Sequence, residues 1–368
     1  MQTSHKLTHV LLALAAMVAC ISTAWAQLPP NAGNTTNIPS TEKPGSMLYY
    51  DIYTSKVGDA AQNTRMNMTN THPTRPVNVH LFFVRKSDCT IADTYLCLTA
   101  NQTFSFLSSE YDPDETGFLF AVATDAAGVP INHNYLIGDL FVKSNFGTTN
   151  YYQANLGAMA FSARQIYRGV VADQWEVWPE FAQAPVADNG TRAFLAYGQY
   201  RDPNDATAPH ALYDPIPNRL ALDNIQSPVD GNNTLLITHS TQGRVDFAGG
   251  IGTVIGLVYN DTEKGFSYQT SFPGCLEIRQ LNDSTIRIPN GYSKAIPTGR
   301  TGWMTLQSAT NVAGVPNLGL LGAMIVSNAK SNIDKAAFNG GHSLHFLSLR
   351  SNPGFAIPVI PTTTCSNF

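Results

Sequence analysis

The chain has 368 residues, with 22 basic and 26 acidic side chains and a net charge of −4. This mild acidity argues against a nucleic-acid-binding protein, which needs a basic face. Charged residues make up only 13% of the chain, against about 25% in a typical globular protein. Asn, Thr, Ser and Gly take their place, which is typical of an extracellular β-protein rather than a cytosolic enzyme.

Residues 1–26 predict a secretory signal peptide. His5 and Lys6 precede an apolar run over residues 10–19, and small residues stand at Ala24 and Ala26, where a signal peptidase reads. We therefore expect cleavage before Gln27 and a secreted bacterial protein, located in the periplasm, at the cell surface or outside the cell. Cys20 leaves lipidation open as an alternative. No later segment has the length and hydropathy of a transmembrane helix.

The remaining four cysteines, Cys89, Cys97, Cys275 and Cys365, form an even set in a chain predicted to be exported. Such a set favours disulfides, and four cysteines allow three pairings. The short loop between Cys89 and Cys97 favours that pair, which leaves Cys275 and Cys365 to tie down the C-terminal tail. A zinc site is disfavoured because no C-x-x-C pair is present.

We expect an all-β fold of two antiparallel, immunoglobulin-like β-sandwich domains. Residues 47–145 are predicted to form the first sandwich, residues 146–209 a mixed connector and residues 210–368 the second sandwich. Residues 27–46, rich in Pro, Asn and Thr, predict a flexible leader. Because an open sheet edge can accept a strand from a partner, this leader is also a candidate donor segment.

Period-two alternation or a short apolar run marks the predicted strands. In the first sandwich they cover residues 48–53, 64–70, 77–84, 103–107 and 117–123. Later strands are predicted at residues 193–198, 234–238, 253–259, 266–270, 275–279, 303–306, 319–326 and 343–349. Residues 137–142 fit either a strand or a helix, and residues 156–166 have helical spacing. We find no repeat of short fixed period, which argues against a solenoid or a propeller.

Two aromatic side chains, Trp175 and Trp178, stand three residues apart within the predicted connector. Exposed aromatic rings of this kind can stack on the apolar face of a sugar. The competing interpretation is that both rings are buried against the seam between the domains, where aromatic side chains contribute large apolar areas.

A calcium loop is the other candidate cofactor site. Asp112 and Asp114 alternate before Gly117, as at the start of a calcium-binding loop, but the distant Glu of an EF-hand is missing. An ordinary hairpin connection explains the same residues. We expect no other cofactor.

His342 and His345 are a candidate metal pair. A metalloprotease helix places two His four residues apart around a Glu, whereas these two are three apart in a predicted strand. Because side chains three apart in a strand point to opposite faces, we expect one buried and one exposed His. No Gly-x-Ser-x-Gly nucleophile motif is present, and we assign no catalytic residue.

Several segments resemble a group of exported bacterial all-β proteins that carries no assigned function. The resemblance rests on residues 63–71, 79–84, 97–103, 258–263 and 338–345. It implies export and brings over no catalytic or binding residues.

The sequence thus predicts a cell-surface or extracellular structural or binding module without catalytic chemistry. Its expected partner is a cell-surface protein or a polysaccharide. Two alternatives stay open: a carbohydrate-binding protein that uses Trp175 and Trp178, and a secreted hydrolase with dispersed catalytic residues. Exposed Trp rings favour the first alternative, and a cleft that holds a His or carboxylate pair favours the second.

Overall fold

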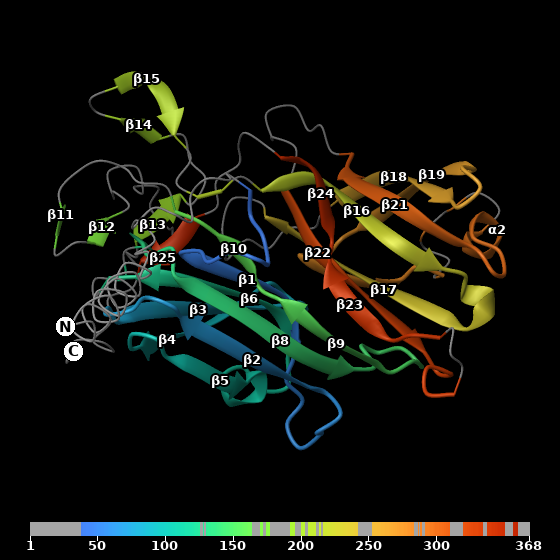
Figure 1. Ribbon diagram of the computed structural model, residues 1–368, viewed down its shortest axis with the longest axis horizontal. Helices are drawn as coiled ribbons and strands as arrows, with labels where there is room; N and C mark the ends of the chain where they lie inside the picture. Colours follow the sequence, from blue (N-terminus) through green and yellow to red (C-terminus); the bar gives the residue numbers. More distant parts are fainter. Residues whose placement is uncertain are drawn as a thin grey trace, which may run out of the picture. The chain divides into compact units, whose positions relative to one another are not determined.

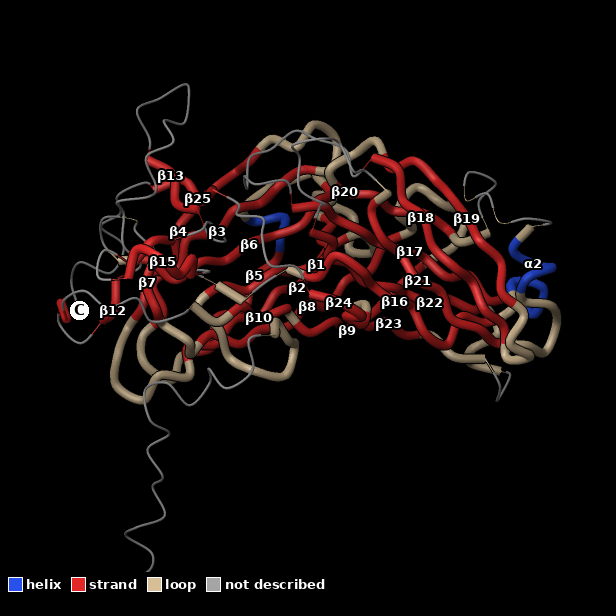
Figure 2. Tube along the Cα trace, turned by 90° about the horizontal axis from the view of Figure 1, so that it is seen from above, coloured by secondary structure: helices blue, strands red, loops and turns tan. Residues whose placement is uncertain are grey.

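The computed structural model describes residues 38–125, 128, 130–163, 170–171, 174–176, 192–195, 200–202, 205–210, 213–214, 216–241, 252–282, 286, 288, 291–309, 319–333, 337–349 and 356–359. These residues form mostly strands (Figure 2), so the predicted all-β class is confirmed. Within the described ranges, helix occurs in α2 (Tyr292–Ala295) and in the 3-10 turns η1 (Ser108–Glu110) and η3 (Pro228–Asp230).

The first sandwich contains a five-strand sheet and a four-strand sheet (Figure 1). The first five-strand sheet has the antiparallel order β10-β1-β6-β3-β4, and the first four-strand sheet has the order β5-β2-β8-β9. The strands are β1 (Met47–Thr54), β2 (Asn63–Asn70), β3 (Val77–Arg85), β4 (Ile91–Leu98), β5 (Thr103–Leu107), β6 (Thr116–Thr124), β8 (Leu136–Ser144), β9 (Tyr152–Gly157) and β10 (Met159–Phe161).

The second sandwich, yellow to red in Figure 1, has the same make-up. The second five-strand sheet has the order β24-β16-β21-β18-β19, and the second four-strand sheet has the order β20-β17-β22-β23. The strands are β16 (Pro217–Gln226), β17 (Asn232–Thr241), β18 (Gly252–Asn260), β19 (Gly265–Phe272), β20 (Leu276–Gln280), β21 (Thr301–Ser308), β22 (Gly319–Asn328), β23 (Gly340–Ser343) and β24 (His345–Leu349).

The two sandwiches share one topology. When their strands are matched in chain order, with β7 left out, both sheet orders coincide strand for strand. The register agrees as well. Gly138 and Gly322 lie at the same place in β8 and β22, and each accepts a hydrogen bond through its carbonyl, from Ala158 N at 2.9 Å and from Leu344 N at 2.8 Å. At Ala158, between β9 and β10, and at Leu344, between β23 and β24, the chain leaves the four-strand sheet and joins the five-strand sheet.

The remaining strands are short. They are β7 (Ile131–Asn132), β11 (Val170–Val171), β12 (Gln174–Glu176), β13 (Arg192–Leu195), β14 (Tyr200–Asp202), β15 (Asp205–His210) and β25 (Ala356–Val359). β12 pairs with β7 and β11, β13 pairs with β25, and β14 pairs with β15.

Two boundaries differ from the sequence prediction. The helix expected at residues 156–166 is wrong over its described part, because β9 and β10 extend the first sandwich to Phe161. The end of the predicted leader is held in place: Ser40 bridges Ala160, and Gly45 N donates to Leu136 O at 2.9 Å. Residues 27–37 lie outside the described residues.

The second four-strand sheet is apolar on both faces. Alternate side chains of β17 and β22 serve two cores. Leu236, Leu320 and Met324 join the core of the second sandwich. The side chains between them, Leu235, Ile237, Leu321, Ala323 and Ile325, join the core of the first sandwich. His239 completes this contact, with its ring 3.8 Å from that of Phe118 and 5.6 Å from that of Tyr49. We call the surface of this sheet that packs on the first sandwich, formed by Leu235, Ile237, His239, Leu321, Ala323 and Ile325, the docking face.

A disulfide links the two sandwiches. Cys89, in the β3–β4 hairpin, bonds to Cys275, which precedes β20, with a Cα–Cα distance of 6.2 Å. The predicted Cys89–Cys97 pair is therefore wrong. Because β4 is extended, it carries Cys97 about 20 Å away from the hairpin, far beyond the roughly 7 Å that a disulfide can bridge. The predicted Cys275–Cys365 pair is wrong as well, because Cys275 is bonded to Cys89. Cys97 is itself disulfide-bonded, and Cys365 lies outside the described residues.

Candidate binding groove

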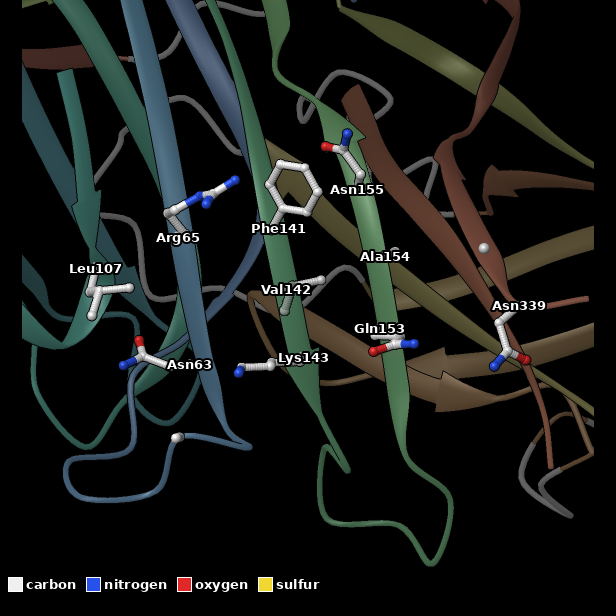
Figure 3. Close-up of a pocket in the computed structure, with 12 residues that line it drawn as sticks. Asn63, Arg65, Leu107, Phe141, Val142, Lys143, Gln153, Ala154, Asn155 and Asn339 are labelled. Atoms are coloured by element: carbon white, nitrogen blue, oxygen red, sulfur yellow. The ribbon is translucent and has the colours of Figure 1, made fainter. Parts of the chain in front are cut away.

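A groove of about 810 Å³ lies on the exposed face of the first four-strand sheet (Figure 3). Its walls come from three neighbouring strands, β2, β8 and β9, with contributions from the end of β5 and the start of β23. The described lining residues are Ala60, Asn63, Arg65, Leu107, Phe141, Val142, Lys143, Gln153, Ala154, Asn155, Asn339 and Gly340.

Strand alternation builds the floor of this groove. In β8, Leu140 and Val142 are buried while Phe141 and Lys143 are exposed, and β2 and β9 alternate in the same way. Antiparallel pairing aligns the exposed side chains into rows across the strands. One row runs from Arg65 through Phe141 to Asn155.

One row of the groove holds a cation above an aromatic ring. The Arg65 guanidinium carbon lies 4.6 Å from the centroid of the Phe141 ring, and Figure 3 shows the two side chains on adjacent strands. Such a contact holds the guanidinium in place while its N–H groups stay available. Phe141 is 42% exposed, so part of its ring is free to contact a ligand.

The groove has a positive and amide-rich lining. Lys143 stands in the next row, flanked by Asn63 on β2 and Gln153 on β9. None of the described lining residues is acidic. The nearby Asp139 accepts a hydrogen bond from Asn67 Nδ2 at 2.5 Å. The arrangement offers donors and acceptors for hydroxyl groups and two cations for an anionic group.

The predicted calcium residues hold loops in place. The buried Asp112 carboxylate accepts hydrogen bonds from Arg85 Nε and Nη2 at 3.1 and 2.8 Å, and from the Tyr53 hydroxyl. The bond to Asp112 raises the pKa of Arg85, and burial followed by the same carboxylate raises the pKa of Tyr53. Asp114 Oδ1 accepts from Val57 N at 3.0 Å. These contacts do not test calcium binding, which stays a prediction.

The predicted aromatic pair is not placed by this structure. Trp175 lies in β12, where the strand is described without its side chains, and Trp178 lies outside the described residues. A sugar-binding role for these two residues therefore stays a prediction. The groove is formed by other residues, and its alternating pattern in β2 and β8 was the signal available for it in the sequence.

The structure brings His342 and His345 together. Their ring centroids are 5.3 Å apart, and each Nε2 lies next to Asp223 Oδ1. The expectation that they point to opposite faces is wrong. The reason is the break at Leu344 between β23 and β24, which interrupts the strand alternation.

Among the residues that the structure describes, no helix is long and apolar enough to cross a membrane.

No protein-family model and no curated protein matches the chain. Three solved structures are similar to it in part. The structure of Thermotoga maritima 1070 has a TM-score of 0.25 and 8% identity, over 32% of this chain and 95% of that one. The α-L-rhamnosidase of Streptomyces avermitilis with L-rhamnose has a TM-score of 0.21 and 11% identity, over 83% of this chain and 28% of the enzyme. The CupB6 tip adhesin of Pseudomonas aeruginosa has a TM-score of 0.12 and 8% identity, over 81% of this chain and 89% of the adhesin. Likeness at this level identifies no family and carries no functional argument.

Proposed function

We propose that this protein is an exported binding module whose groove binds an acidic polysaccharide. The observation that carries the proposal is the Arg65–Phe141 pair in an open groove. A sugar ring presents an apolar face to an aromatic side chain and hydroxyl groups to amides. A uronic acid adds a carboxylate, which Arg recognises with two parallel hydrogen bonds.

The lining provides a partner for each of these groups. Phe141 offers the stacking surface, and Asn63, Gln153 and Asn155 offer amides on either side of it. Arg65 and Lys143 offer positive charge in neighbouring rows, separated by the two-residue repeat of a strand. A volume of about 810 Å³ falls within the 300–1,000 Å³ usual for small-ligand sites, so the groove accommodates a short stretch of a chain.

Export forms the other half of the proposal. The predicted signal at residues 1–26 supports it, and so does the Cys89–Cys275 bond, because disulfides persist in oxidising compartments outside the cytoplasm. Intact-mass analysis of the protein exported by a bacterial host tests it. We expect a mature chain that begins at Gln27. A lipid-modified chain that begins at Cys20 would instead favour anchoring.

Ligand binding is tested with polygalacturonate and its fully methyl-esterified form, which share a backbone and differ in charge. We expect the purified protein to bind the acid at least tenfold more tightly than the ester in affinity electrophoresis and calorimetry. Phe141→Ala should weaken binding of both forms. Arg65→Gln should mainly reduce the preference for the acid.

Ile137→Ala is the matched control. Ile137 is 41% exposed and lies four residues before Phe141 on the same face of β8, outside the groove lining. We expect this variant to bind like the native protein. If alginate, hyaluronate and polygalacturonate all bind equally well with and without Phe141, the groove is not the binding site and the proposal is wrong.

A further inference from the structure

Three metal-ligand side chains meet on the second sandwich. His342 Nε2 lies 3.0 Å and His345 Nε2 lies 3.3 Å from Asp223 Oδ1. All three ligand atoms lie within 4.8 Å of one another. Each comes from a different strand: Asp223 from β16, His342 from β23 and His345 from β24.

The convergence depends on two irregularities in the strands. Asp223 stands in a bulge of β16, between Leu222 and Ile225, where the register with β21 shifts. Leu344 separates β23, which pairs with β22, from β24, which pairs with β16. The buried Leu344 side chain and the bond from Leu344 N to Gly322 O fix this change of sheet. The two His side chains therefore reach the same carboxylate from two sheets.

A backbone hydrogen bond orients the ring of His342. Its Nδ1 lies 2.8 Å from the Ser343 carbonyl oxygen. Because a carbonyl only accepts, Nδ1 donates to it, and Nε2 is the ring nitrogen directed at Asp223. A backbone bond to the other ring nitrogen is the usual support of a metal-ligating His.

We propose that Asp223, His342 and His345 form a binding site for a divalent transition-metal ion of the Zn²⁺ type. Zn²⁺ binds His nitrogen and carboxylate oxygen at about 2.0–2.2 Å, which sets neighbouring tetrahedral ligands about 3.4 Å apart. The two His–Asp distances, 3.0 and 3.3 Å, are close to this spacing. Side chains that are 39%, 57% and 55% exposed for His342, His345 and Asp223 leave the remaining coordination position open to solvent or to a further ligand.

The first sandwich provides an internal comparison. The positions equivalent to Asp223, His342 and His345 hold Asp51, Leu156 and Met159, as the shared register requires. The bulge and its Asp occur in both sandwiches, whereas the two His ligands occur only in the second. The site is therefore a property of these side chains and not of the topology alone.

Calorimetric titration of tag-free, EDTA-treated protein with Zn²⁺ tests the proposal. We expect a site with one Zn²⁺ per chain, and at least tenfold weaker binding in His342→Gln, His345→Gln and Asp223→Asn. Co²⁺ should give the absorption bands of a tetrahedral N/O site, which the same variants lose. Ca²⁺, which prefers oxygen ligands, should bind far more weakly.

Asp93→Asn is the matched control. Asp93 accepts from His80 at 2.9 Å, a His–Asp contact that belongs to no cluster of three metal-ligand side chains among the described residues. Its removal should leave Zn²⁺ affinity unchanged. The proposal is overturned if the native protein binds no Zn²⁺ at one per chain, or if the three variants keep native affinity. In either case the cluster is an ion pair only. Both results are independent of polysaccharide binding.

Discussion

The two four-strand sheets occupy the same place in one topology, yet their outer faces differ in chemistry and in use. Register equates Arg65 with Leu235 and Phe141 with Ile325. In the second sandwich this face is apolar and packs on the first sandwich. In the first sandwich it is exposed, cationic and grooved. The fold thus presents the same sheet face in both sandwiches. The side chains on that face determine whether it packs against the other sandwich or faces solvent.

The two five-strand sheets also differ, but here the equivalent side chain is buried in the first sandwich and exposed in the second. In the first, the bulge residue Asp51 is only 1% exposed, and Ser343 Oγ of the second sandwich donates to its Oδ2 at 3.0 Å. In the second, the equivalent Asp223 is exposed beside His342 and His345. Docking therefore covers the bulge Asp of the first sandwich and leaves that of the second exposed.

The largest expected difference between the outer faces of the two four-strand sheets comes from placing a charge on each of them. Ile325→Glu buries an unpaired carboxylate at a position that is 0% exposed. We expect a loss of more than about 4 kcal/mol in the free energy of unfolding, or no folded protein. The equivalent change, Phe141→Glu, stays in solvent beside Arg65 and should change stability by about 0.5 kcal/mol or less. Urea unfolding followed by far-UV circular dichroism measures both. Equal losses in the two variants would contradict the assignment of the docking face.

The second prediction uses the two equivalent Asp residues. Burial raises the pKa of Asp51 from 3.8 to about 7, and the bond from Ser343 opposes this only partly. Between pH 4 and 7 the native state holds a proton that the unfolded state has released, so stability falls as pH rises. Asp51→Asn should match the native protein near pH 4. At pH 8 it should be more stable by on the order of 4 kcal/mol.

The measurement is the difference in unfolding free energy between the native protein and Asp51→Asn from pH 4 to 8. Burial also lowers the pKa of His239 to about 3, which destabilises both proteins below about pH 6.5, so this contribution cancels in the difference. Asp223→Asn, the same change at the equivalent exposed position, is the comparison variant, because the burial that causes the effect at Asp51 is absent there. Parallel curves for the native protein and Asp51→Asn would contradict the prediction.

Much of the fold could be predicted because its strands alternate or form apolar runs. The runs in β3 and β6 are continuous because the first five-strand sheet is covered on both faces. β4 gives a weak strand signal because polar residues such as Asp93 interrupt it, and because Cys89, before it, and Cys97, within it, suggest a closed loop. The small residues of β9 and β10 mimic helical spacing. The recurrence of Thr-Gly-aromatic at Gly117 and Gly302 was a sequence signal of the shared topology.

The sites could be predicted only in part, because each is assembled from distant strands. Alternation in β2 indicates that Arg65 is exposed, but nothing local places it over Phe141, which lies 76 positions later. The rule of alternating faces holds for a continuous strand, whereas the segment that carries His342 and His345 is interrupted at Leu344. The interruption depends on a backbone bond to Gly322, and a tertiary contact of this kind leaves no periodic trace in the sequence.

The third prediction concerns the covalent link between the sandwiches. The double variant Cys89→Ser, Cys275→Ser removes a bond that spans 186 positions of the chain. We expect a loss of about 2–4 kcal/mol, measured as a shift of the urea midpoint against the native protein. Phe141-dependent polysaccharide binding should persist, because Arg65 and Phe141 both lie in the first four-strand sheet. Peptide mapping of the unreduced native protein should join Cys89 to Cys275, and a Cys89–Cys97 peptide would contradict the structure.

The smallest expected change in stability tests the contact between the equivalent edge strands β9 and β23, which lie side by side. A Cβ at Gly341 would lie 2.9 Å from Ala154 Cβ and 2.7 Å from Met324 O, whereas nothing lies within 4 Å of one at Gly340. Gly341→Ala should therefore cost about 1–3 kcal/mol through overpacking. Gly340→Ala should be neutral, or should stabilise by up to about 1 kcal/mol by restricting the unfolded chain. Thermal unfolding compares the two. Because Asn155 occupies the position equivalent to Gly341, equal stability of both variants would mean that glycine is not what lets the second sandwich approach the first.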